Sequence, residues 1–132
     1  MPALGDLEVQ VMRRIWARGE PVTVRDVLGD LETERPIAYT TVMTVMGNLR
    51  KKGWLRRHAE GRAYRYEPLV SAEEYSAGLI RQALAASTDR PAVLMHFIEE
   101  LSAEEAGALE EAYQRLTGQR RSKTRASRRG AR

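Results

Sequence analysis

Apolar residues near the N-terminus recur at the spacing of an α-helix, in two consecutive stretches. The first stretch covers residues 6–18 and aligns on one face Leu7, Val11 and Ile15, which are about one helical turn apart. The second begins after Thr23, a side chain able to cap a helix, and its stripe consists of Val24, Val27, Leu28 and Leu31. Pro36 separates this stretch from the next. The pattern therefore predicts two short amphipathic helices.

A third helix is predicted over residues 38–52, and its two faces differ in chemistry. The apolar face follows the helical period and carries Ala38, Val42, Val45 and Leu49. The opposite face carries Thr41, Thr44, Asn48 and Lys51. Because positions three and four residues apart share one surface of a helix, we expect one face to build a core and the other to hydrogen-bond outward.

An aromatic and basic segment follows at residues 54–67. Strands are favoured by Trp54, Leu55, Tyr64 and Tyr66. Glu60-Gly61 favours a turn between them, and Pro68 ends the second strand. Two helices at helix-turn-helix spacing, followed by a hairpin, predict a winged helix-turn-helix in which residues 38–52 form the recognition helix. The alternative is a small α+β core whose charges are simply solvated.

Three further helices are predicted in the C-terminal half. Ser71 with Glu74, and Ser102 with Glu105, form the capping-box pattern, and Pro91 suits the first turn of a helix between them. These helices total about 45 residues, too few for an independent core, so their apolar stripes imply pairing with a second copy. The expected dimerisation residues are Tyr75, Leu79, Leu94, Phe97, Ile98, Leu109, Tyr113 and Leu116.

The predicted fold is mainly helical with one small β-hairpin, an α+β chain in three segments that differ in charge. The winged-helix domain, residues 1–70, has 12 Lys/Arg and 9 Asp/Glu; the dimerisation region, residues 71–117, has 3 and 9; a basic disordered tail, residues 118–132, has 7 and 0. The tail contributes most of the high pI. A basic segment joined to an acidic one indicates that the basic one faces a polyanion.

The chain offers few residues for catalysis. It has no cysteine and only two histidines, His58 and His96, whereas nucleophilic or metal-dependent hydrolysis needs a positioned base or clustered ligands. Glycine-rich phosphate-binding motifs are missing as well. We therefore expect no enzyme activity, no cofactor or metal and no small-molecule ligand. Since no apolar run approaches the roughly 20 residues of a membrane span, we expect a cytoplasmic protein.

Residues of the third helix and the hairpin instead suit double-stranded DNA. Short polar side chains let a helix approach base edges, and asparagine can pair with adenine through two hydrogen bonds. Basic side chains at the helix end and the hairpin tip suit phosphates. The expected DNA-binding residues are Tyr39, Thr40, Thr41, Thr44, Asn48, Arg50, Lys51, Lys52 and Arg62, flanked by Arg56, Arg57 and Arg65. Packing under the hairpin is an equal alternative for Tyr39, and packing or thymine-methyl contact is expected of Met43 and Met46.

Four blocks of sequence follow one another at characteristic spacing: LGDLEVQVMRRIW, AYTTVMTVMGNLRKKGWL, GRAYRYEP and LMHFIEELSAEE. Together they resemble the penicillinase repressor family over about residues 4 to 116. The resemblance implies an N-terminal winged helix that binds a palindromic operator and a C-terminal region that forms a homodimer. It also implies a link to antibiotic resistance, because family repressors are cut by, or downstream of, a membrane-bound sensor metalloprotease that responds to β-lactams.

The bond that matches the family's cleavage site is His96-Phe97, where His replaces the Asn of relatives. Two other features depart from the family. The cysteine motif of its copper-responsive branch is missing, since the chain contains no cysteine, and the arginine-rich tail lies outside the shared pattern.

Two other functions fit the same residues. One is a winged-helix module that docks protein through its polar helix face, and the other is a nonspecific architectural or RNA-binding protein driven by the tail. Salt separates the first from DNA binding, because affinity falls steeply with salt only where phosphates are contacted. Deleting residues 118–132 separates the second, because a sequence-specific repressor keeps its preference without them.

Overall fold

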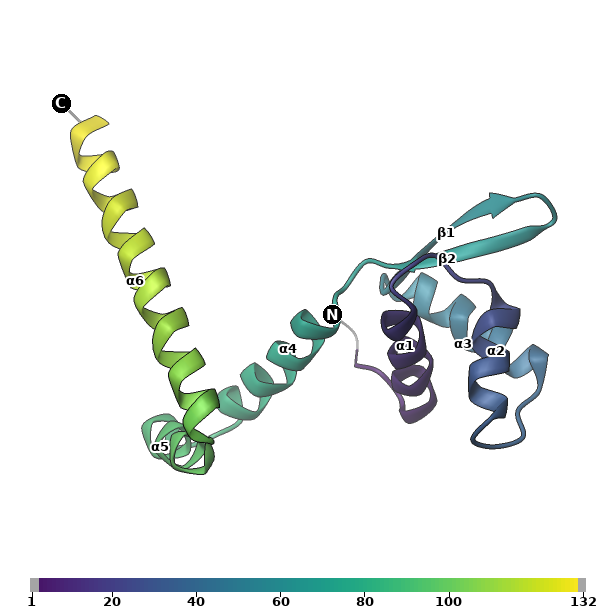
Figure 1. Cartoon of the computed structure of the whole chain (residues 1–132), viewed down its shortest axis with the longest axis horizontal. Coiled ribbons are helices and arrows are strands. Elements are labelled where there is room, and N and C mark those ends of the chain that lie inside the picture. The colour runs from purple at the N-terminus through teal and green to yellow at the C-terminus, as the bar shows by residue number, and fades with distance from the viewer. Residues whose placement is uncertain (1–2, 131–132) are drawn as a thin grey trace. The chain divides into compact units, whose positions relative to one another are not determined.

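The computed structural model describes residues 3–130, and the side chains of residues 3–120. Over this range it contains six helices and one antiparallel sheet of two strands, which confirms the expected fold class (Figure 1). The elements are α1 (Asp6–Arg18), α2 (Val24–Glu32), α3 (Tyr39–Lys51), β1 (Leu55–Glu60), β2 (Ala63–Pro68), α4 (Ala72–Ala85), α5 (Arg90–Glu100) and α6 (Ala103–Gly130). None of the helices described is both long enough and apolar enough to cross a membrane.

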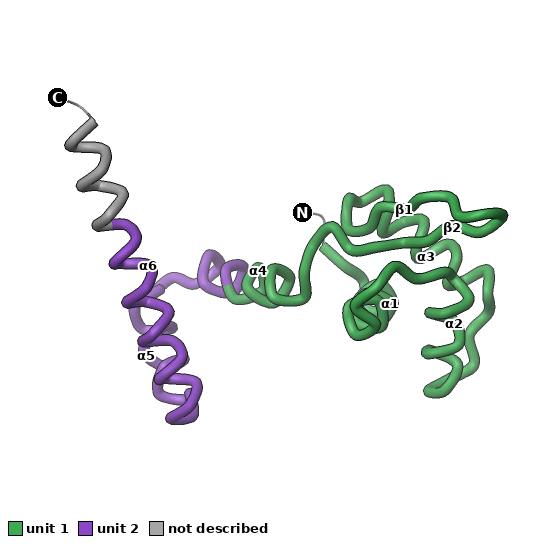
Figure 2. The backbone as a smooth tube through the Cα atoms, turned by 45° about the horizontal axis from the view of Figure 1, so that its top comes forward, with its two compact units in different colours: residues 1–80 green, residues 81–132 purple. Residues whose placement is uncertain are grey.

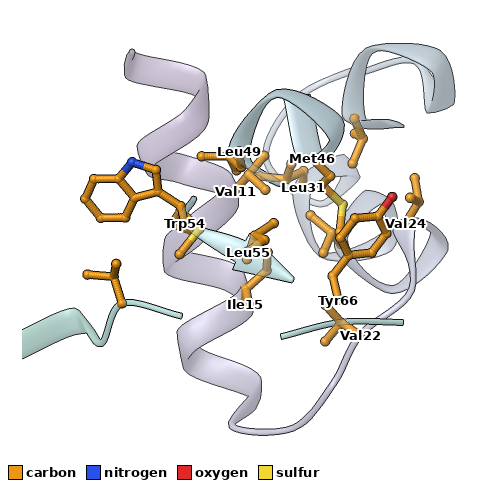
Figure 3. Packing of buried hydrophobic residues seen from close by; sticks show 14 residues of the cluster. Val11, Ile15, Val22, Val24, Leu31, Met46, Leu49, Trp54, Leu55 and Tyr66 are labelled. Carbon is orange, nitrogen blue, oxygen red and sulfur yellow. The ribbon is translucent and has the colours of Figure 1, made fainter. Parts of the chain in front are cut away.

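The chain divides into two compact units, residues 1–80 and 81–132 (Figure 2). All buried side chains of the described residues belong to the first unit, and they come from α1, α2, α3, the hairpin and its flanks (Figure 3). The core consists of Val11, Met12, Ile15, Val22, Val24, Val27, Leu31, Val42, Met46, Leu49, Trp54, Leu55, Tyr66 and Val70. The predicted stripes of α1 and α2 thus supply one wall of this core.

The position of α2 is fixed by polar contacts that the sequence pattern only partly predicts. As predicted, Thr23 caps the helix: its Oγ1 accepts from the Asp26 backbone N–H at 3.2 Å, and its own N–H donates to Asp26 Oδ2 at 2.9 Å. Arg18 at the end of α1 donates to both carboxylate oxygens of Asp30, at 2.9 and 3.1 Å. This bidentate pair joins α1 to the last turn of α2.

Helix α3 buries a face slightly different from the predicted one. Val42, Met46 and Leu49 are buried, whereas Ala38 is exposed and Val45 is only partly buried. Ala38 is the N-cap and has an extended backbone (φ −83°, ψ 146°), so it lies outside the helical repeat. Met46 takes the place in the core that the pattern assigned to Ala38.

The hairpin pairs β1 with β2 so that Leu55 faces Pro68 and Glu60 faces Ala63. Gly61 has φ +63°, and the two-residue turn is therefore Gly61-Arg62, one residue later than predicted. Glycine suits the first position of such a turn because a side chain disfavours positive φ. Val22, in the loop before α2, bonds both backbone groups of Tyr66, at 2.9 and 2.7 Å, and ties the hairpin to the helices.

The second half of the chain is helical as expected, but none of the described side chains between residues 71 and 120 is buried. Ser102 and Glu105 form both bonds of the predicted capping box, at 2.9 and 3.1 Å. Large apolar side chains therefore lie exposed along these helices: Leu79, Ile80, Val93, Leu94, Met95, Phe97, Ile98, Leu109, Tyr113 and Leu116.

Two expectations for this half differ from the structure. Tyr75, an expected dimerisation residue, packs its ring 5.6 Å from Trp16 and 5.7 Å from Trp54, because the first turn of α4 belongs to the first unit. That unit consequently extends past the expected boundary at Val70. The expected disordered tail begins inside α6, which continues through Gly118 as far as Gly130. Its composition of Arg, Lys, Gln and Ala favours helix, and no proline interrupts it.

Candidate nucleic-acid interface

One face of α3 is a row of short polar side chains open to solvent. Thr40, Thr41, Thr44 and Asn48 are all exposed, while the opposite face of the same helix buries Val42, Met46 and Leu49. The helix cannot rotate without exposing Val42, Met46 and Leu49, so the core fixes which side chains face outward. The row combines hydroxyl groups with one amide, and both can donate and accept hydrogen bonds.

Basic residues flank the row at the end of α3, but they are not equivalent. Arg50 and Lys51 are exposed. Lys52 instead donates to Glu8 Oε1 at 2.7 Å and to the Ala3 carbonyl at 3.4 Å, and its partner Glu8 is only 13% exposed. Lys52 was expected to contact DNA, whereas the structure engages it in holding α3 to α1. The basic end of the helix is therefore formed by Arg50 and Lys51.

The hairpin presents two different faces because strand side chains alternate. On one face Arg56 pairs with Glu67 and Arg65 pairs with Glu60, so these arginines are neutralised within the hairpin. On the other face Arg57 lies 4.0 Å above the Tyr64 ring. A hydrogen bond to Tyr66 raises the pKa of the Arg57 guanidinium. Of the three flanking arginines, Arg56 and Arg65 thus each have a carboxylate partner, and Arg57 has none among the described residues.

A cleft of about 420 Å³ lies between α2, α3 and the hairpin. Its lining residues are Thr23, Val24, Arg25, Tyr39, Met43, Arg57, Arg62, Ala63, Tyr64 and Tyr66. None of these described residues is acidic. Arg25 lies 5.3 Å from the centre of the Tyr39 ring. The cleft adjoins the polar row, since Tyr39 and Met43 precede Thr40 and Thr44 by one residue.

Arg25 is a candidate that the sequence pattern did not single out. It occupies the second position of α2, beside the buried Val24, and its side chain is exposed. The sequence could have indicated Arg25 by its position outside the apolar stripe of α2, because such a position faces away from the core. The stripe consists of Val24, Val27, Leu28 and Leu31. The two methionines predicted to pack or to contact thymine also differ in exposure. Met46 is fully buried, while Met43 is 45% exposed and lines the cleft.

The fold and this exposed face define a winged helix-turn-helix, with α2 and α3 as the helical pair and β1 and β2 as the wing (Figure 1). The sequence profile of the penicillinase repressor family matches residues 4–115. The chain belongs to the penicillinase repressor family. Its named relatives are regulators and repressors of transcription and not enzymes.

Three relatives illustrate this membership. The chain is 47% identical over 116 residues to the transcriptional regulator BlaI of Mycobacterium tuberculosis, which covers 86% of this chain and 84% of the relative. It is 31% identical over 75 residues to the penicillinase repressor of Bacillus licheniformis, covering 57% and 58%. The solution structure of the DNA binding domain of the repressor BlaI matches with a TM-score of 0.50 and 31% identity, over 56% of this chain and 89% of that one.

Proposed function

We propose that the protein is a homodimeric transcriptional repressor that binds a palindromic operator in double-stranded DNA. The observation that supports this most is the polar row of α3, whose four exposed side chains lie opposite the buried Val42, Met46 and Leu49. In a winged helix-turn-helix this helix enters the major groove, where short polar side chains reach base edges. Asn48 is proposed to read a base, and Thr40, Thr41 and Thr44 to bring the helix close.

Phosphate contacts are assigned to the basic groups around this row. Arg50 and Lys51 lie at its end, and Arg62 lies at the tip of the wing. Such contacts position a protein on DNA without reading sequence. Lys52 is left out of this assignment because Glu8 already holds its ammonium group.

Homodimer formation is proposed through the second half of the chain. The described side chains of residues 71–120 are never buried, although α5 alone exposes Val93, Leu94, Met95, Phe97 and Ile98. Apolar surface of this extent is favourably removed from water by a second copy. A two-fold dimer presents two recognition helices to two half-sites, which is why the operator is proposed to be palindromic.

Release from the operator is proposed to follow proteolysis at His96-Phe97, after a membrane sensor has responded to a β-lactam or cell-wall stress. Both residues lie in α5, and both side chains are exposed. A peptide bond within a helix must unwind before a protease can bind it, so cleavage at this bond requires local opening of α5. Mass spectrometry of the protein from β-lactam-treated cells should detect a fragment that ends at His96; a chain that stays intact while its genes are induced would contradict this step.

Selection of duplexes from a random pool tests the DNA-binding proposal. The full chain should enrich a two-fold symmetric sequence, and its affinity for that sequence should fall steeply as salt rises. Binding that is weak, unselective and independent of salt would instead favour a protein-docking module. Selective binding by a chain that sedimentation shows to be monomeric would contradict the homodimer.

A further inference from the structure

The cleft between α2, α3 and the wing carries two arginines that are each laid on an aromatic ring. Arg25 lies on Tyr39 and Arg57 on Tyr64, at 5.3 and 4.0 Å from the ring centres. A ring face attracts a cation but leaves the guanidinium N–H groups at its edge available to an anion. Arg57 also donates to Tyr66, which lines the same cleft. Both arginines are thus held in place while their remaining N–H groups stay available.

The surroundings of the cleft leave this charge uncompensated. The acidic residue next to Arg25, Asp26, accepts from the Thr23 backbone N–H at 2.9 Å and has its charged partner in Arg18, at 3.9 Å, which is not a lining residue of the cleft. The acidic residues of the wing pair with Arg56 and Arg65 on its other face. None of the described lining residues is acidic, and three of them are arginines. The cleft beside the polar row of α3 therefore carries a net positive charge.

We infer that this cleft holds the sugar-phosphate backbone of one DNA strand, with Arg25 and Arg57 as phosphate ligands presented by Tyr39 and Tyr64. The inference rests on the proposed DNA-binding function and extends it to a helix, α2, that carries no expected contact. It also gives Tyr39 a definite role, because its ring supports Arg25 and its hydroxyl is dispensable. The wing would then contact the DNA strand from one side through Arg57, and α2 would contact it from the other side through Arg25.

Salt titration of the full chain on the selected duplex tests the ligands. Arg25→Gln and Arg57→Gln should each lower the salt slope by about 0.9, so the affinity ratio of wild type to variant shrinks about 3.5-fold between about 50 and 200 mM salt. Arg13→Gln, which removes an exposed arginine of α1 outside the cleft, is the matched control and should leave the slope unchanged. Equal slopes for all four proteins would overturn the inference.

Tyr39 variants test the ring. Tyr39→Phe should bind like the wild type, whereas Tyr39→Leu should lose about as much affinity as Arg25→Gln, and the double variant with Arg25→Gln should lose no more. A Phe variant that binds as weakly as the Leu variant would assign the contact to the hydroxyl and overturn the role of the ring.

Neutral methylphosphonates, introduced at one phosphate at a time, locate the contact. At one position the substitution should weaken wild-type binding but not that of Arg25→Gln. If no position shows this coupling while the wild type still prefers the selected duplex, the cleft assignment fails and the proposed function stands. If the wild type shows neither preference nor salt dependence, the proposed function itself fails.

Discussion

Lys52 and Glu8 form an ion pair of 2.7 Å between the residue that follows α3 and the first turn of α1. Glu8 Oε1 also accepts from the Gly5 backbone N–H at 2.8 Å, so the same carboxylate caps α1 and anchors α3. Burial raises the pKa of the Glu8 carboxyl, but the bonds from Gly5 and Lys52 outweigh burial and hold the pKa below its usual range. The end of α3 is therefore placed by a contact within the fold.

Variants of the adjacent residues Lys51 and Lys52 test whether Lys52 stabilises the fold while Lys51 contacts DNA. Lys52→Gln should lower the free energy of unfolding by about 1 to 2 kcal/mol, because it breaks a partly buried charged hydrogen bond, and should leave the salt slope of DNA binding unchanged. Lys51→Gln should do the reverse, with little change in stability and a slope lower by about 0.9. Urea denaturation and salt titration measure the two quantities. Identical behaviour of the two variants would refute the separation of roles.

Acid should weaken the first unit through three carboxyl groups. The Arg18 hydrogen bond lowers the pKa of Asp30, and the Thr23 backbone N–H lowers the pKa of Asp26, as Gly5 and Lys52 do for Glu8. A carboxyl with a lowered folded-state pKa contributes stability above its unfolded pKa of about 4, and that contribution is lost as the pH falls through the folded-state pKa.

The matching experiment follows unfolding by tryptophan fluorescence, since Trp16 and Trp54 both lie in the first unit. Asp30→Asn should be less stable than the wild type at pH 7 and should lose less stability between about pH 5 and pH 2. Glu32→Gln, which removes an exposed carboxyl of the same helix, should keep the wild-type profile. A wild-type pH profile for Asp30→Asn would contradict the assignment.

Negative charges introduced on the apolar surface of α5 should dissociate the proposed dimer into monomers. Leu94→Glu together with Ile98→Glu places two carboxylates on an exposed apolar helix, and their burial against a second copy is unfavourable. The variant should sediment as a monomer and lose about 10² to 10⁴ in operator affinity, because the second half-site no longer binds intramolecularly. Leu69→Glu, at an exposed leucine of the first unit, should remain dimeric. Full operator affinity in a proven monomer would show that dimerisation does not set affinity.

The features of this fold that the sequence predicts are those set by interactions between neighbouring residues. The bounds of α1, the Thr23 cap of α2 and the Ser102 capping box depend on near neighbours, and sequence spacing alone predicts them. The exposure of Ala38 and the difference between buried Met46 and exposed Met43 could not be predicted in this way, because the orientation of α3 depends on packing against other elements.

Contacts between residues far apart in the sequence explain why several residues of the structure differ from their predicted roles. Lys52 has the same side chain as Lys51, and only the approach of Glu8, 44 residues away, distinguishes them. Tyr75 fits the apolar stripe of α4, yet Trp16 and Trp54 lie close enough to take its ring. Arg56 and Arg65 likewise become neutral pairs only when the strand register brings Glu67 and Glu60 beside them.

Sequence reading by α3 can be measured as the ratio of affinities for the selected duplex and a random one. Asn48→Ala should lower this ratio by about 1 to 3 kcal/mol of discrimination, because it removes a base contact. Arg62→Ala should weaken both duplexes alike and preserve the ratio, because a phosphate contact carries no sequence information. We therefore expect only Asn48→Ala to change the ratio; equal losses on both duplexes for Asn48→Ala would show that α3 does not read sequence through this residue.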